Sequence, residues 1–222
     1  MRRVHGAAFL SLDGVMQAPG GPEEDPTGGF PYGGWTATFW DEGMSGPMGK
    51  LFEGDFDLLL GRRTYDIFAA HWPYNQDKPI GAKFQKIRKY VVSSSDDPLE
   101  WDNSQALRGD PADSVEALKA GDGPDLLIQG SSEIYPPLFA AGLVDRLTLI
   151  TFPVILGRGK RLFGGDGAQG KAWSLAEHHV STTGVIIATY DRGGEVPIGS
   201  FASKEPSEAE FERRRKMEAG TW

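Results

Sequence analysis

The sequence has no cysteine among its 222 residues. A disulfide framework, a thiolate nucleophile and a zinc–thiolate site are therefore excluded. Four histidines are present, His5, His71, His178 and His179, and they lack the spacing of metal ligands. Because His178 and His179 are adjacent, they would point to opposite faces of a strand. We expect no metal site.

A net positive charge and long apolar runs are also absent. The net charge is −8 at pH 7, and no stripe of Lys and Arg precedes the C-terminal tail, which disfavours binding to a phosphate backbone. No apolar run approaches the roughly 20 residues that span a bilayer. Arg2 and Arg3 precede only a short apolar stretch without the cleavage pattern of a signal peptide. We expect a cytoplasmic protein that binds neither nucleic acid nor a membrane.

Glycine and proline are abundant instead, with 30 and 15 residues. Many of them lie in residues 17–34, a segment too long for a simple turn. Long segments of this kind are either binding loops and lids or disordered. Phe30, Tyr32 and Trp35 give this segment apolar surface to bury, which favours a lid.

Apolar patterning predicts one α/β domain over residues 1–192 and a charged tail over 193–222. Strands are expected at 4–12, 56–60, 90–95, 126–129 and 147–152, with a hairpin at 176–181 and 185–190. Helices are expected at about 36–54, where glycines and Pro47 weaken the pattern, and at 64–70, 83–88, 114–119 and 133–141. The tail has capping-box spacing at Ser207 and Glu210, and we expect a peripheral helix, a disordered end or a clasp on a partner subunit.

Two strand-to-helix junctions, Asp57–Tyr65 and Asp125–Tyr135, have the pattern of anion-binding sites. In each, an apolar run is followed by a glycine and then by hydroxyl or guanidinium groups where a helix begins. The free N–H groups of a first helical turn, together with Arg62, Arg63 and Thr64, suit a phosphate. The alternative is that both arginines are surface charges. Cations oppose the dipole of a helix N-terminus, so a bound anion explains the pair better. Two such sites suggest a dinucleotide.

Six short motifs occur in the order found in one known family. They are Ser11–Gly14, Leu60–Tyr65, Val92–Ser94, Gln129–Tyr135, Gly142–Arg146 and Pro153–Gly159. With them, the chain resembles the dihydrofolate reductase-like fold over about residues 3–190. It is most similar to the branch that contains the RibD C-terminal reductase domain of riboflavin biosynthesis and its stand-alone relatives. The resemblance implies a three-layer α/β fold with a mostly parallel central sheet and an antiparallel C-terminal hairpin. It also implies NADPH as cofactor, hydride transfer to a pterin-like or pyrimidine-like substrate, and a homodimer.

The resemblance also implies which residues bind the cofactor. The pyrophosphate and 2′-phosphate are assigned to Gly61, Arg62, Arg63 and Thr64. The adenosine end is assigned to Ser93 and Ser94, although a serine run of this kind also forms simple turns. The nicotinamide side is assigned to Gly130, Ser131 and Ser132, with Tyr135 behind them. Dihydrofolate reductase itself has a glycine pair where this chain has Gln129-Gly130, so the closest backbone approach shifts to Gly130 and Ser131.

Hydride transfer needs a group that protonates or polarises the atom gaining electrons. Asp13 is the first candidate, because it ends the first strand where an open α/β sheet presents its ligands. The alternative for Asp13 is a turn-forming Asp-Gly pair. Asp41 and Glu42 are rivals, because dihydrofolate reductase carries its substrate carboxylate on the first helix. Trp35 and Trp40 either stack on a flat heterocyclic substrate or belong to the core.

The sequence therefore predicts an NADPH-dependent reductase of a small heterocyclic or carbonyl substrate. A non-catalytic ligand-binding or sensor protein on the same fold is the competing class, because function lies in the site and not in the fold. True riboflavin-pathway reduction is a second enzymatic alternative. The chain lacks the deaminase domain and its zinc ligands, which favours a stand-alone paralogue.

Overall fold

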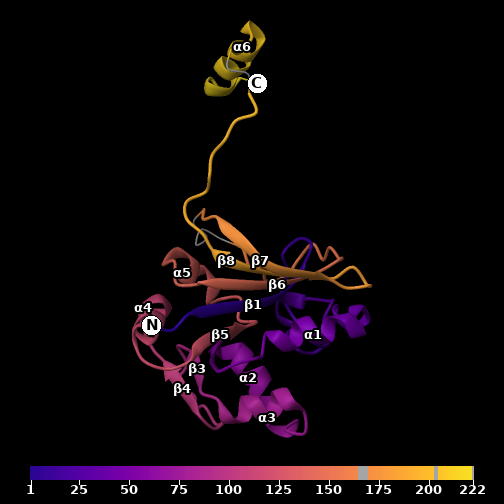
Figure 1. Ribbon diagram of the computed structural model, residues 1–222, viewed down its shortest axis with the longest axis vertical. Coiled ribbons are helices and arrows are strands. Elements are labelled where there is room, and N and C mark those ends of the chain that lie inside the picture. Colours follow the sequence, from indigo (N-terminus) through magenta and orange to yellow (C-terminus); the bar gives the residue numbers. More distant parts are fainter. Residues whose placement is uncertain (165–169, 203–204, 222) are drawn as a thin grey trace.

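The computed structural model describes residues 1–164, 170–202 and 205–221. Eight strands form one sheet in the order β4-β3-β2-β5-β1-β6-β8-β7 (Figure 1). The strands are β1 (Val4–Ser11), β2 (Phe56–Gly61), β3 (Lys89–Val92), β4 (Ser104–Leu107), β5 (Asp125–Gln129), β6 (Arg146–Phe152), β7 (Trp173–Val180) and β8 (Ile186–Arg192). The α-helices are α1 (Glu42–Lys50), α2 (Arg62–His71), α3 (Pro79–Lys86), α4 (Pro111–Ala120), α5 (Tyr135–Ala140) and α6 (Glu208–Glu218). Short 3₁₀ helices span Thr27–Gly29, Ala37–Phe39 and Trp72–Tyr74.

The six strands from β4 to β6 pair in parallel, and β8 and β7 complete the sheet antiparallel. The expected fold class, a mostly parallel sheet with an antiparallel C-terminal hairpin, is confirmed. Parallel strands that point the same way end at the same edge of the sheet. The segments that follow β1, β2, β3 and β5 are therefore brought together at that edge.

Helices cover both faces of the parallel part of the sheet. Strand β2 is a continuous apolar run whose residues Leu58, Leu59 and Leu60 are all fully buried, as in a parallel strand that is covered on two sides. Leu59 shares one buried cluster with α4 and α5. Leu58 and Leu60 share the other with α1, α2 and α3. This two-sided packing fixes β2 in register and places the start of α2 at the edge of the sheet.

Several elements differ from the expected ranges. The first helix is shorter than 36–54, because Asp41 caps α1 by accepting a hydrogen bond from the Met44 N–H. Strand β4 was not expected, since its sequence Ser-Gln-Ala-Leu lacks an apolar alternation. Helix α2 begins at Arg62, so both arginines lie in its first turn. Strand β3 ends at Val92 and leaves the serines after it in a loop.

The tail forms a helix that stands apart from the sheet. Ser207 caps α6 through its hydroxyl, which accepts from the Glu210 N–H, so this half of the expected capping box is confirmed. Figure 1 shows that an extended segment carries α6 away from the rest of the molecule. Within the described residues, no helix combines the length and the apolar character needed to cross a membrane.

Candidate functional site

A cleft of about 750 Å³ opens at the edge where the parallel strands end. Its walls come from the segments after β1, β2, β3, β4 and β5. Nine of the ten expected cofactor residues line it: Gly61, Arg62, Arg63, Thr64, Ser93, Ser94, Gly130, Ser131 and Ser132. The fold thus brings together residues that are far apart in the sequence, at the position where open α/β sheets bind ligands.

The two junctions are directly hydrogen-bonded to each other. The Gly61 N–H donates to the Ser131 hydroxyl over 2.9 Å, and the Ser131 N–H donates to the Thr64 hydroxyl over 3.1 Å. These bonds form because β2 and β5 are neighbours in the sheet. The start of α2 and the turn after β5 therefore make one rigid surface rather than two independent sites.

The turn after β5 has an unusual backbone. Gly130 and Ser131 both lie in the left-handed region, with φ of +62° and +63°. A side chain at Gly130 would also come within 3.3 Å of the Thr64 methyl group. Ser131 pays a conformational cost there, and such outliers occur preferentially in ligand-binding segments.

Arginine side chains hold the rim of the cleft through exposed contacts. Arg62 donates to Asp66 over 2.8 Å and to the Asp97 carbonyl over 2.9 Å. Arg63 pairs with Glu133 over 2.6 Å. Exposed pairs of this kind are worth only about 0–1 kcal/mol each. A phosphate entering the cleft can therefore replace these partners at little cost.

A third arginine in the cleft was missed from the sequence. Arg108 follows β4, donates to the carbonyls of Ser93 and Ser95, and lies 3.7 Å from Asp96. It was missed because β4 was not recognised. The Arg108-Gly109 pair directly after β4 was the available signal in the sequence.

The Gly/Pro-rich segment forms one wall of the cleft. Gln17 donates to the carbonyls of Asp25 and Thr27, and Lys160 pairs with Asp25 over 2.5 Å. Phe30 is buried against Val15 and Ala18. The segment is packed and anchored, and its role as a lid remains a prediction.

Glu24, in this segment, is a cleft carboxyl group that sequence reasoning missed. Burial raises the pKa of Glu24, while N–H groups of Gly20 and Gly21 act in the opposite direction. Its position in the run Glu23-Glu24-Asp25 resembled an ordinary solvated loop. A carboxyl group with a raised pKa in a cleft is a candidate proton donor.

Asp13 lies outside the residues that line the cleft and is fully engaged. Its carboxylate accepts from the Ser11 hydroxyl over 2.6 Å and from the N–H groups of Leu156 and Gly157, and it pairs with Arg161. The Ser11 hydroxyl, followed by these backbone N–H groups, holds the pKa of Asp13 well below its usual range. This arrangement suits a carboxylate that fixes a turn, and it opposes proton donation near neutral pH.

Asp41 is also engaged in structural contacts. Besides capping α1, it accepts from the N–H and the hydroxyl of Thr182, in the turn between β7 and β8. The Thr182 hydroxyl in particular lowers the pKa of Asp41. Glu42 is exposed beside it, and neither residue lines the cleft.

The three expected aromatic residues lie behind the cleft or beside it. Trp35 donates from its indole N–H to the Gln17 carbonyl and packs edge-on against Phe152. Trp40 is 45% exposed and contacts Phe9, which lines the cleft. Tyr135 is fully buried, and burial raises the pKa of its hydroxyl. Tyr135 therefore supports the turn after β5 from inside the core.

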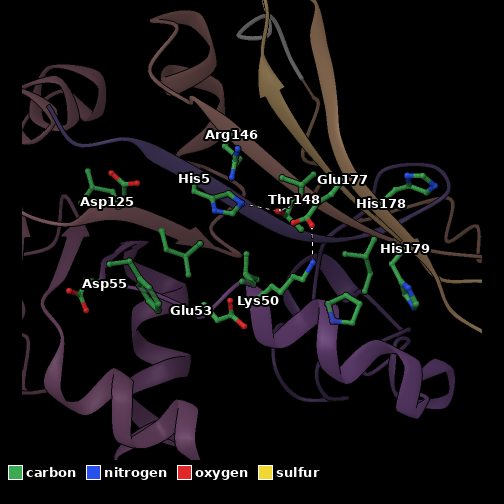
Figure 2. A pocket seen from close by; sticks show the side chains of 17 residues that line it. His5, Lys50, Glu53, Asp55, Asp125, Arg146, Thr148, Glu177, His178 and His179 are labelled. Carbon is green, nitrogen blue, oxygen red and sulfur yellow. Dashed lines mark hydrogen bonds and ion pairs between the residues drawn. The ribbon is translucent and has the colours of Figure 1, made fainter.

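A second cavity, of about 350 Å³, lies at the opposite edge, where the parallel strands begin (Figure 2). His5 is hydrogen-bonded to Thr148, and Lys50 is paired with Glu177 across the cavity. Burial, followed by the charges of Arg146 and Arg3, lowers the pKa of His5 to about 4. Among the described residues, no cluster of three or more His, Asp or Glu side chains could hold a metal ion.

Comparisons with known proteins give the family and agree with the fold. The family model of the RibD C-terminal domain matches residues 2–187. An uncharacterized protein of Bacillus subtilis, YyaP, is 32% identical over 142 residues, which cover 62% of this chain and 74% of that protein. A putative riboflavin biosynthesis protein from Shewanella sp. PV-4 superposes with a TM-score of 0.62 at 20% identity, covering 86% of this chain and 99% of that one. Dihydrofolate reductase from Enterococcus faecalis, solved with NADP(H), superposes with a TM-score of 0.53 at 16% identity, covering 86% and 96%.

Proposed function

The chain belongs to the RibD C-terminal domain family, and from this premise we propose that it is an NADPH-dependent reductase of a small heterocyclic or carbonyl substrate. The observation that carries the proposal is a pair of hydrogen bonds at Ser131, whose hydroxyl accepts from the Gly61 N–H and whose N–H donates to the Thr64 hydroxyl. These bonds join the start of α2 and the turn after β5, the two junctions expected to bind phosphate, into one surface beside Arg62, Arg63 and Arg108.

The residues of the cleft fit the phosphates of such a cofactor. Arg62 and Arg63 lie in the first turn of α2, a ten-residue helix, where N–H groups are free to bind an anion. Arg108 and Ser93 follow β4 and β3, at one end of the strand order, and Arg62 reaches the Asp97 carbonyl in the loop after β3; together they suit a 2′-phosphate on the adenosine side. Gly130 leaves room for close approach of a ligand to the backbone. When bound, the cofactor would supply a hydride.

The other end of the cleft suits a flat substrate. Phe9 and Phe68 provide apolar surface there, and Glu24 and Lys160 provide polar groups. Because burial raises the pKa of Glu24, this carboxyl keeps its proton to a higher pH than an ordinary glutamate does. We assign to it the role of proton donor to the reduced substrate.

The assay is the loss of NADPH absorbance with a panel of pterins, pyrimidines and small carbonyl compounds. Glu24→Gln is nearly isosteric and removes the ionisable group, so it should lower kcat at least about tenfold and leave the Kd of NADPH nearly unchanged. Glu23→Gln, beside it and outside the cleft, is the matched control. Unchanged turnover in Glu24→Gln removes Glu24 from the chemistry.

Nucleotide binding without turnover is the second candidate function. The specific observation in its favour is that Asp13 and Asp41 are both committed to structural hydrogen bonds. Tight NADPH binding with no reduction across the whole panel is the outcome that supports this alternative.

A further inference from the structure

The tail carries apolar side chains that are half to fully exposed in the described part of the chain. Val196 is 50% exposed, Ile198 is 96% exposed and Phe201 is fully exposed. On α6, Phe211 is 49% exposed. These residues lie beyond residues 2–187, which match the family model.

A second apolar surface lies on the sheet and is covered only in part: it runs from β6, where Leu147 is buried, across β8 to the edge strand β7. Leu147, Tyr190 and Leu175 are aligned across the three strands and therefore share one face. A groove of about 410 Å³ lies on this surface, lined mostly by apolar side chains such as Leu149 and Trp173. Leu175 is 54% exposed, and β7 is an edge strand. We call this surface the wing groove.

The tail begins at the rim of its own wing groove and then leaves it. Lys171, in the lining of the groove, pairs with Glu195, and the Gly193 N–H donates to the Ala172 carbonyl. Val196 precedes Pro197, which favours extended backbone and keeps the chain moving outward. Figure 1 shows the segment running away from the sheet. Ile198 and Phe201 are thus carried away from the groove at which the tail starts.

We propose that the wing groove receives the tail of a second copy of this chain, with Ile198 and Phe201 as the anchoring side chains. An exchange of this kind is symmetric, so each of the two tails covers one of the two grooves. A stable interface buries about 800 Å² per partner. An aromatic side chain alone buries about 150–250 Å². Each tail, with its four apolar side chains, supplies a large part of this area, and the groove that it covers adds more.

The absence of cysteine allows a direct crosslinking test. Ser200→Cys, an exposed position that leaves Ile198 and Phe201 intact, and Leu175→Cys are made together in one chain. The product of a bifunctional maleimide is analysed by denaturing electrophoresis and intact mass. The exchanged tail predicts a covalent dimer. An intramolecular crosslink in a monomer would show that the tail folds back onto its own groove. The absence of any crosslink would show that the tail does not reach a groove. Either result overturns the proposal. The control pairs Ser200→Cys with Leu12→Cys. Leu12 is 61% exposed and lies after β1, outside the wing groove.

Light scattering after size exclusion gives a second, independent readout. The unmodified protein should be a dimer at micromolar concentration, and Ile198→Ser combined with Phe201→Ser should shift it to a monomer. Both positions are exposed in the single chain, so circular dichroism should be unchanged. Tyr74 is 83% exposed and lies after α2, so Tyr74→Ser is the control variant and should remain a dimer. A monomeric unmodified protein, or a dimer in the double serine variant, overturns the proposal.

Discussion

At the residue scale, Asp13 illustrates how hydrogen bonding decides the chemistry of a carboxylate. The four donors around it stabilise the ionised form, and together they connect the end of β1 to residues 156–161. A group held ionised in this way is a poor acid at neutral pH.

Asp13→Asn should therefore act mainly on stability. The amide cannot accept from all four donors, and we expect the free energy of unfolding to fall by about 1–3 kcal/mol. Because the pKa of Asp13 is depressed in the fold, its stabilisation is present above the unfolded pKa and is lost as pH falls through the folded value. Urea unfolding measures the change, with Asp77→Asn on the surface as control. A variant of unchanged stability but abolished turnover would return Asp13 to the role of catalytic acid.

His5 gives a second prediction at the residue scale, which concerns the free energy of unfolding at acid pH. Its pKa is about 4 in the fold against 6.5 for the free group, so the unfolded chain binds the proton more readily. Stability should therefore decrease as pH falls below 6.5, with the loss complete below about 4. From pH 7 to pH 5 the expected loss from His5 is at most about 2 kcal/mol. Urea unfolding of His5→Gln should show a smaller decrease over this interval, whereas an equal decrease would contradict the assignment.

At the scale of elements, the segment 17–34 is the wall of the cleft that we expect to move. Its attachments are side-chain hydrogen bonds and the Lys160–Asp25 pair, rather than strand pairing with the sheet. Segments held in this way are used as lids.

Hydrogen exchange tests the lid directly. Exchange in residues 18–34 should slow when NADPH and a substrate are bound together, and residues 79–86 of α3, outside the cleft, should not change. Lys160→Ala should speed exchange of this segment in the free protein. Unchanged protection with a turnover-competent pair would show that the segment is a fixed wall.

The elements that the sequence predicted well are those with strong local signals. The apolar run of β2 and the turn at Gly130 can both be recognised from their residue types. Because each is followed by residues that line the cleft, the position of the cleft could be predicted from them. Strand β4 could not be predicted, because it forms through pairing with β3 and its own four residues carry no strand pattern. The engagement of Asp13 with Leu156 also depends on a contact between segments 143 residues apart.

At the scale of the whole molecule, the two edges of the sheet have different chemistry. Arg62, Arg63 and Arg108 line the cleft at the edge where the parallel strands end, although the net charge of the protein is −8. The opposite edge holds a smaller cavity with a neutral histidine and paired charges. A local excess of arginine in an acidic protein favours an anionic ligand that is bound by direct contact rather than by long-range attraction.

The central claim is that this cleft binds NADPH, and fluorescence titration with NADPH and with NADH tests it most directly. Charge-assisted hydrogen bonds to the 2′-phosphate are worth about 1.5–3 kcal/mol, so NADPH should bind roughly 10- to 150-fold more tightly than NADH. Arg62→Ala and Arg108→Ala should each remove much of this preference. Arg88→Ala, an exposed arginine outside the cleft, should leave it intact. Equal affinity for the two cofactors in the unmodified protein, or no binding of either, would contradict the account.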